Sequence, residues 1–418
     1  MIATVAQLAA ILLILYAGRA AARLLRQPEV IGEICAGLLF GYLVMRIAGP
    51  EGLDEVLSVG LTEVVHAVGH AGLALFLVGM AFELRRGLGR IRLREVGAVT
   101  AGALALPLAA GAGLAWWLFA TGRPELTGTA AAPAFVAMIA ISLAVTAVPV
   151  LARILAARGL ADDTAGTLAL GSAVLIDAVA WLLLSVVIGL SAAGLGGVLL
   201  SIAVSCGGIA TALGARRLLD RARIGALCAA HPGLAVVLTG LLAVAAMWAA
   251  GRWGLTEFLG PLLVGLALPA DRAGRPPAWG RLAASTGGLG LRLVPALFVV
   301  TGITLFAGPE PASVGWEVIA LVTVLAMIGK IGGGYLGAVA AGHSPRTGFQ
   351  VGVLMNARGL TEIVFLQSGY AAGLLSPALY LAFLVMAVVT TAATGPLLSV
   401  VDRISASPGM TKKGAVLP

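Results

Sequence analysis

The sequence predicts an all-α polytopic membrane protein, and its composition is the first observation that points to this class. Of the 418 residues, 60% are hydrophobic and only 11% are charged, whereas a soluble domain carries about 25% charged residues. The mean hydropathy is +1.04. The chain also holds 57 glycines, and membrane helices use small residues where their backbones approach closely. A soluble enzyme with an unusually large core is a poor alternative.

The second observation is the regular spacing of the apolar segments. A bilayer core takes about 20 apolar residues per helix. Thirteen segments fit this length, of which the ninth, LTEFLGPLLVGLALP, is the shortest. The expected transmembrane helices lie near residues 3–24, 29–49, 61–82, 96–119, 131–155, 167–190, 195–215, 233–250, 255–269, 290–307, 314–340, 347–371 and 377–401.

The third observation is the distribution of basic residues, which predicts how the chain is oriented. If the N-terminus lies outside the cell, the connections after odd-numbered helices are cytoplasmic. Those connections and the C-terminal segment contain 21 of the 27 Lys and Arg residues, as cytoplasmic loops usually do. We therefore expect a multi-pass protein of the inner (plasma) membrane with a cytoplasmic C-terminus. The net charge of +8 is explained by basic cytoplasmic loops of a protein embedded in the lipid bilayer, so no nucleic-acid partner is expected.

Three isolated charges lie inside the apolar spans. Asp177 stands in GSAVLIDAVAWLLLSVV, Lys330 in MIGKIGGGYLG and Arg358 in MNARGLTEIVF. Charges within a membrane are costly, and they usually mark ion paths or internal pairs. The spans contain no Ser/Lys, paired-Asp or HExxH arrangement, so we do not expect an enzyme, and nothing indicates a cofactor.

Two of the expected helices contain residues that interrupt helical hydrogen bonding. In the fifth, Pro149 removes a backbone donor and frees carbonyl groups near Thr146. In the twelfth, Asn356 and Gly359 loosen the helix. Interrupted helices at corresponding places in the two halves of a chain indicate inverted repeats with a binding site at the membrane midplane. Pro149 alone is also compatible with a simple kink, but together with the three buried charges the pattern favours a transporter.

The motifs, taken in order, resemble those of monovalent cation:proton antiporters. TAVPVLARIL, GSAVLIDAVAW, IGK and MNARGLTEIVFL follow one another with the spacing of the second cation:proton antiporter family, whose members exchange sodium or potassium for protons. QPEVIGEICAGLLFG and LALFLVGMAFEL resemble the second- and third-helix signatures of that family. The resemblance extends from about residue 20 to residue 400.

The resemblance implies a sodium/proton antiporter-like fold of about thirteen helices, in which two broken helices cross at the midplane. It also implies a homodimer formed through a scaffold lobe, against which a core lobe moves. The expected parts are a membrane transporter domain at 1–402, with scaffold helices near 3–82 and 233–307, core helices near 96–190 and 314–401, a linking helix near 195–215, and a short cytoplasmic tail at 403–418.

The resemblance also assigns roles to individual residues. Asp177 matches the carboxylate that binds either the monovalent cation or a proton, and Thr146 matches a ligand from the broken helix. Lys330 matches a lysine near the site, which pairs either with Asp177 in the ion-free state or with carbonyl groups at the helix crossing. Arg358 and Glu362 match the charged residues of the twelfth-helix motif, and their spacing of four predicts an internal salt bridge.

We therefore expect a secondary active antiporter that exchanges Na⁺ or K⁺ for H⁺ by alternating access. A carboxylate in apolar surroundings suits this exchange because its charge must be neutralised by a proton or a cation. Ile176 departs from the family pattern, in which Asp, Asn or Gln usually precedes the aspartate. A single acid favours one cation per proton and therefore electroneutral exchange. Glu33 matches a second-helix glutamate with an expected structural role.

Two other functions are compatible with the residues. A sodium-coupled transporter of organic solutes has a related fold and would fit the less polar site that Ile176 creates. A transport-inactive membrane sensor would also fit the loss of a polar residue. A metal pair at His66 and His70, four residues apart, is a minor alternative because no carboxylate or cysteine stands near them in sequence.

Overall fold

The computed structural model describes residues 2–25, 27, 29–56, 59–88, 93–128, 130–160, 163–252, 257–271, 278–307 and 314–406. Its helices are, in order, α1 (Ile2–Leu24), α2 (Glu29–Val56), α3 (Val59–Leu88), α4 (Leu93–Ala120), α5 (Pro124–Thr127), α6 (Ala132–Ala144), α7 (Val148–Arg158), α8 (Thr164–Leu219), α9 (Ala222–Ala230), α10 (Pro232–Arg252), α11 (Leu259–Ala267), α12 (Ala278–Leu293), α13 (Pro295–Ala307), α14 (Trp316–Ala340), α15 (Pro345–Met355), α16 (Leu360–Ala371) and α17 (Pro377–Ala406). No strand occurs within these ranges, which confirms the all-α class.

Several of these helices are long enough to cross a bilayer. Eight segments of the described chain meet both the length and the apolar composition that this requires. The expected number of thirteen spans stays a prediction. The eight segments are Gly60–Glu83, Leu93–Ala120, Ala132–Ala156, Thr164–Leu219, Pro232–Arg252, Ala278–Ile303, Trp316–Ala340 and Pro377–Val401.

The expected boundaries differ from the structure in two places. The tenth span, expected near 290–307, begins twelve residues earlier with α12, and Pro295 separates α12 from α13 because proline lacks the N–H that would continue the helix. The expected domain end at 402 falls inside α17, and residues 407–418 of the tail lie outside the described part. The spans near 167–190 and 195–215 are two helical segments of α8, and the kink between them lies where the sequence predicts it, at Ala193 and Gly194, where Gly194 has a φ of 57°.

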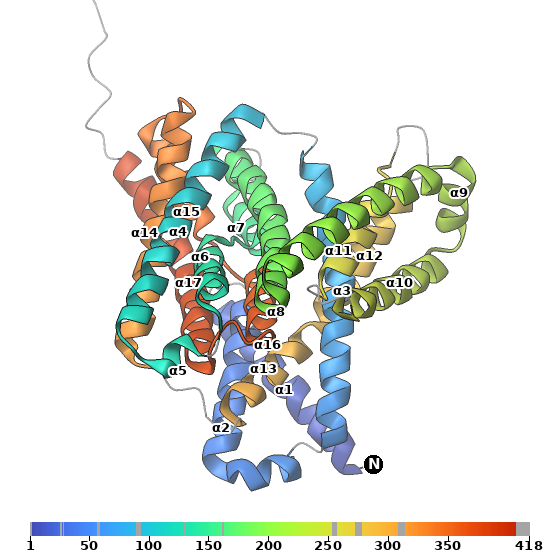
Figure 1. The fold of residues 1–418 in the computed structure, drawn as a ribbon. Helices are drawn as coiled ribbons and strands as arrows, with labels where there is room; N and C mark the ends of the chain where they lie inside the picture. Colours follow the sequence, from blue (N-terminus) through green and yellow to red (C-terminus); the bar gives the residue numbers. More distant parts are fainter. Residues whose placement is uncertain are drawn as a thin grey trace, which may run out of the picture.

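The helices form two packed groups. In one, α2 packs on α1 and α13, and α3 packs on α12 and α11. In the other, α4 packs along α14, and α6, α8, α15 and α17 surround this pair. The second half of α8 leads to α9 and α10 at one side of the molecule (Figure 1). Apolar side chains from both groups share a large core that includes Leu77, Phe135, Phe298 and Phe365.

The contact between α4 and α14 is especially close. A Cβ atom built on Gly102 would lie 2.3 Å from the carbonyl oxygen of Gly333, so only glycine allows the two backbones to meet here. Small residues commonly permit such approach between membrane helices. As a result, the backbone of α4 lies within reach of polar side chains on α14 one turn from Gly333.

Candidate ion site

The candidate site is built around two interrupted helices. α6 ends at Ala144 and α7 begins at Val148, while α15 ends at Met355 and α16 begins at Leu360. Between them, the backbone N–H of Ala147 donates a hydrogen bond of 3.1 Å to the carbonyl oxygen of Ala357. The two connecting segments therefore cross in direct contact, as the predicted inverted repeats require.

The helix-breaking residues stand where these helices begin and end. Pro149 lies in the first turn of α7, where a missing N–H costs no helical hydrogen bond. Asn356 follows the last residue of α15 and donates to the carbonyl oxygen of Thr390 at 3.1 Å, and Gly359 directly precedes α16. Thr146, in the gap between α6 and α7, donates to the carbonyl oxygen of Met355 at 3.4 Å. Each gap is thus tied to the opposite repeat or to α17.

Asp177 lies on α8 beside the crossing and is completely buried. Within the described chain, neither of its carboxyl oxygens has a hydrogen-bond partner, and Asp177 forms no ion pair. The backbone N–H of Val148 lies near this carboxyl group without reaching hydrogen-bonding geometry. This amide belongs to the N-terminus of α7, the end of a helix that carries a partial positive charge. A buried carboxylate with both oxygens free is an incomplete arrangement that a proton or a cation would complete.

Lys330, on α14, is also completely buried, and its ammonium group is fully engaged elsewhere. It donates to the carbonyl oxygens of Ala103 (3.3 Å) and Ala144 and to the hydroxyl oxygen of Thr146 (2.6 Å). Ala103 is within reach because Gly102 and Gly333 bring α4 and α14 together. Of the two arrangements expected for Lys330, the structure therefore shows the one with carbonyl groups at the helix crossing.

Arg358 and Glu362 form the predicted internal salt bridge, and both side chains are inaccessible to solvent. The same guanidinium donates to the carbonyl oxygens of Ser142 (3.0 Å) and Leu143 (2.7 Å). These carbonyls belong to the last turn of α6, where no following helical N–H group is present to donate to them. Together with the bond from Lys330 to Ala144, two cationic side chains satisfy the negative end of α6.

Ile176 and Glu33 lie outside this polar network. Ile176 is completely buried and belongs to an apolar cluster with Val150 and Met355. The position at which the family usually places a polar residue is therefore part of the hydrophobic core in this chain. Glu33 is buried in α2 and forms an ion pair with Arg19 of α1, as its expected structural role requires.

Sequence reasoning missed the backbone carbonyls of Ala103, Ser142 and Leu143. No side-chain signal marks a carbonyl group, because every residue carries one.

Sequence reasoning also missed a carboxylate near the histidines. His66 and His70 stack with ring centroids 4.1 Å apart, and Glu257, distant in sequence, lies 3.6 Å from Nδ1 of His70. In the part of the chain that the structure describes, no group of three such residues has the arrangement of a metal site.

Solved structures support the fold. The sodium proton antiporter MjNhaP1 from Methanocaldococcus jannaschii superposes with a TM-score of 0.62, covering 98% of this chain and 100% of that one. At 15% sequence identity, this likeness shows the antiporter-like fold alone.

Curated relatives cover nearly all of the chain. The Cation/H⁺ antiporter 18 of Arabidopsis thaliana is 30% identical over 390 residues, which are 91% of this chain but 46% of that protein. The chain thus spans about half the length of this plant relative. The Na⁺/H⁺ antiporter NhaS4 of Synechocystis sp. is 29% identical over 380 residues, 89% of this chain and 90% of that one.

The family model described as "Sodium/hydrogen exchanger, transmembrane" matches residues 9–401. This range includes both broken helices, Asp177 and the charged residues around the crossing. The resemblance found in the sequence motifs is thereby confirmed, and the chain belongs to the sodium/hydrogen exchanger transmembrane family.

Proposed function

We propose that the chain exchanges a monovalent cation, Na⁺ or K⁺, for H⁺ across a membrane, with Asp177 as the shared binding group. The observation that carries this proposal is the free carboxyl group of Asp177, buried beside two crossing broken helices. Relatives of the chain in three kingdoms of life carry names of cation/H⁺, Na⁺/H⁺ and K⁺/H⁺ antiporters. Their names support a monovalent cation and H⁺ as the substrates. The site itself offers only a few polar atoms.

The exchange follows from competition for one negative charge. Burying an ionised carboxylate without a partner is costly, so Asp177 binds either a proton or a metal cation in the absence of water. A bound cation would be coordinated by the carboxylate oxygens of Asp177. The hydroxyl oxygen of Thr146, on the broken helix, would be a further ligand. In the arrangement seen here, the Thr146 hydroxyl accepts from Lys330, so its use by a cation requires the ammonium to shift.

The oxygen atoms around Lys330 indicate how the crossing accommodates positive charge. One hydroxyl and two carbonyl oxygens surround the ammonium group, and these are the ligand types that hard cations prefer. The ammonium thus holds together a cage that would otherwise leave three oxygens unpaired. We assign Lys330, Arg358 and Glu362 to supporting the crossing rather than to direct ion contact.

The stoichiometry that fits this arrangement is one cation per proton. Asp177 with a proton and Asp177 with a monovalent cation have the same net charge. Lys330 keeps its positive charge in both states, because the carbonyl oxygens of Ala103 and Ala144 hold its ammonium when a cation takes the Thr146 hydroxyl, and Arg358 is already neutralised by Glu362. Because Ile176 adds no second acid, each turnover moves no net charge.

Alternating access would come from motion between the two packed helix groups. We propose that the moving core consists of α4, α6, α7, the first half of α8 and α14–α17, that the second half of α8 is the linking helix, and that α1–α3 and α10–α13 form the scaffold through which two copies associate. The expected location in the plasma membrane is also part of this proposal. So is the expected orientation, with the N-terminus outside the cell and the C-terminus in the cytoplasm.

Proteoliposomes that contain the purified full chain and a trapped pH dye test the exchange. Na⁺, K⁺ and Li⁺ are added in turn, and an imposed membrane potential tests electroneutrality. We expect Asp177→Asn to abolish cation-driven pH change and Asp163→Asn, an exposed control at the start of the same helix, to retain it. Exchange by Asp177→Asn at the parental rate would refute the assignment of the site, and absence of exchange by the parent with all three cations would refute the function.

A further inference from the structure

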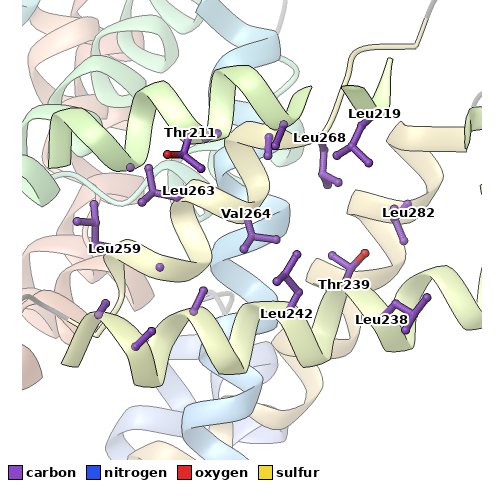
Figure 2. Close-up of a pocket in the computed structure, with 18 of the residues that line it drawn as sticks. Thr211, Leu219, Leu238, Thr239, Leu242, Leu259, Leu263, Val264, Leu268 and Leu282 are labelled. Atoms are coloured by element: carbon purple, nitrogen blue, oxygen red, sulfur yellow. The ribbon is translucent and has the colours of Figure 1, made fainter. Parts of the chain in front are cut away.

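A large apolar cavity lies well away from Asp177, at the side of the molecule. Its volume is about 710 Å³, and it is enclosed by the second half of α8 with α10, α11 and α12. Leu242 and Val264 point toward each other across it, and Leu263 points toward α8 near Thr211 (Figure 2). Thr211, Thr239 and Cys228 contribute the few polar atoms of the lining, and the lining includes no charged side chain. A cavity of this size is typical of ligand sites, but its walls offer water almost no hydrogen bonds.

The cavity opens onto an apolar surface. Leu238 and Leu242 of α10 line it and are nevertheless 57% and 58% exposed. The lining on α8 extends from Val204 to Leu219, a rise of about 22 Å at 1.5 Å per residue. The hydrocarbon core of a bilayer is about 30 Å thick, so the lining along α8 is longer than half of that thickness. Its occupant is therefore long, apolar and able to enter from the membrane.

One end of the cavity carries positive charge. Arg216 directly follows the lining residue Ala215 and is four residues after Ala212, so it lies at the edge of the helix face by which α8 lines the cavity. Arg85, at the end of α3, donates to the carbonyl oxygens of Leu266 (3.3 Å) and Leu268, the latter a lining residue.

The two guanidinium groups lie close enough to influence each other. Burial lowers the pKa of Arg85, and the positive charge of Arg216 lowers it further. Neither group forms an ion pair with any residue that the structure describes. Two like charges that have no acidic partner among the described residues, beside an apolar cavity, would be stabilised by an anion.

We propose that this cavity binds an anionic phospholipid, with one acyl chain in the cavity and the phosphate against Arg85 and Arg216. Arginine suits this role because its planar guanidinium donates to phosphate oxygens in pairs. In the proposed orientation this end faces the cytoplasmic leaflet, where anionic lipids attract basic residues. The site is separate from the exchange site, and its occupancy is measurable without transport.

Native mass spectrometry of the detergent-purified full chain tests the proposal. Phosphatidylglycerol and phosphatidylcholine with identical acyl chains are added separately, and the fraction of protein that retains lipid is measured. We expect Arg216→Ala to reduce retention of phosphatidylglycerol about five-fold, the factor that one arginine near an anionic surface contributes, and to leave phosphatidylcholine unchanged. Arg252→Ala, an exposed arginine at the opposite end of α10 that stacks on Trp248, is the matched control and should retain both lipids like the parent.

A second variant tests the apolar part of the site. Thr239→Trp places a large side chain in the cavity, and retention of both lipids should fall while the melting temperature stays at or above that of the parent. Equal retention of the two lipids by the parent, with no effect of Arg216→Ala, would overturn the assignment of the headgroup. Unchanged retention in Thr239→Trp would overturn the assignment of the cavity. A shift from dimer to monomer in Thr239→Trp, without lipid loss, would show that a second copy of the chain covers it.

Discussion

Replacing Arg358 with methionine tests how the helix crossing is held together. The substitution removes hydrogen bonds to Ser142 and Leu143 and leaves Glu362 without its partner, all at positions inaccessible to solvent. Breaking a buried ion pair by removing one member costs about 3–5 kcal/mol. Dividing this loss by the unfolding entropy of the whole chain, at about 2.1 cal/mol/K per residue, gives a decrease in melting temperature of about 5 °C.

A double-mutant cycle separates the ion pair from the carbonyl contacts. Thermal unfolding in detergent is followed for the parent, Arg358→Met, Glu362→Gln and the double variant. Because the double variant contains no unpaired buried charge, it should be less destabilised than the sum of the two single changes by about 2–3 kcal/mol. Arg123→Met is the control, since Arg123 and Glu317 form a half-exposed pair at 3.6 Å, and such pairs contribute about 0–1 kcal/mol.

Strict additivity in that cycle would refute the reasoning, because it would mean that Arg358 and Glu362 do not stabilise each other. A decrease of less than 1 °C for Arg358→Met would refute it more broadly. In that case the last turn of α6 would not depend on the guanidinium, and the crossing would be held by its backbone contact between Ala147 and Ala357 alone.

Three further changes have defined outcomes. Lys330→Met should lower the melting temperature and make it rise more with Na⁺ or K⁺ than in the parent, because a second cation in the vacated oxygen cage at 100 times its Kd adds about 2.7 kcal/mol. Thermal unfolding with choline as the inert cation checks this, and an equal response in the parent would contradict it. Ile176→Asp should lower the free energy of unfolding by more than about 3 kcal/mol, because it buries a charge. Exchange by this variant should stay insensitive to an imposed voltage. A voltage-dependent rate would contradict this and place residue 176 in the ion path. Gly333→Ala should cost about 1–3 kcal/mol and slow exchange, because its Cβ would lie 2.3 Å from the Gly102 oxygen; Gly97→Ala, which meets open space, should be neutral in both assays.

Local chemistry in the sequence predicted the interrupted helices well. Proline removes a donor wherever the chain places it, so Pro149 identified the beginning of α7 without any knowledge of its neighbours. The spacing of Arg358 and Glu362 likewise predicted their pair, because residues four apart on a helix lie side by side.

Partners from distant segments could not be predicted in this way. The choice between two roles for Lys330 depended on Ala103 and Ala144, each more than 180 positions away. Glu257 reaches His70 only because α11 packs on α3. In a membrane protein the apolar pattern marks spans, but it does not show which faces meet.

The constant charge of Lys330 has an energetic consequence for a cell. A transporter that moves net charge is driven by the membrane potential, at about 2.3 kcal/mol per charge per 100 mV. If the ammonium keeps its proton through the cycle and Asp177 carries one ion each way, that source of energy is unavailable. Concentration gradients alone then set the direction of flux, and a pH difference of one unit balances about a ten-fold cation gradient. Such a protein would continue to couple the two gradients in a fully depolarised membrane.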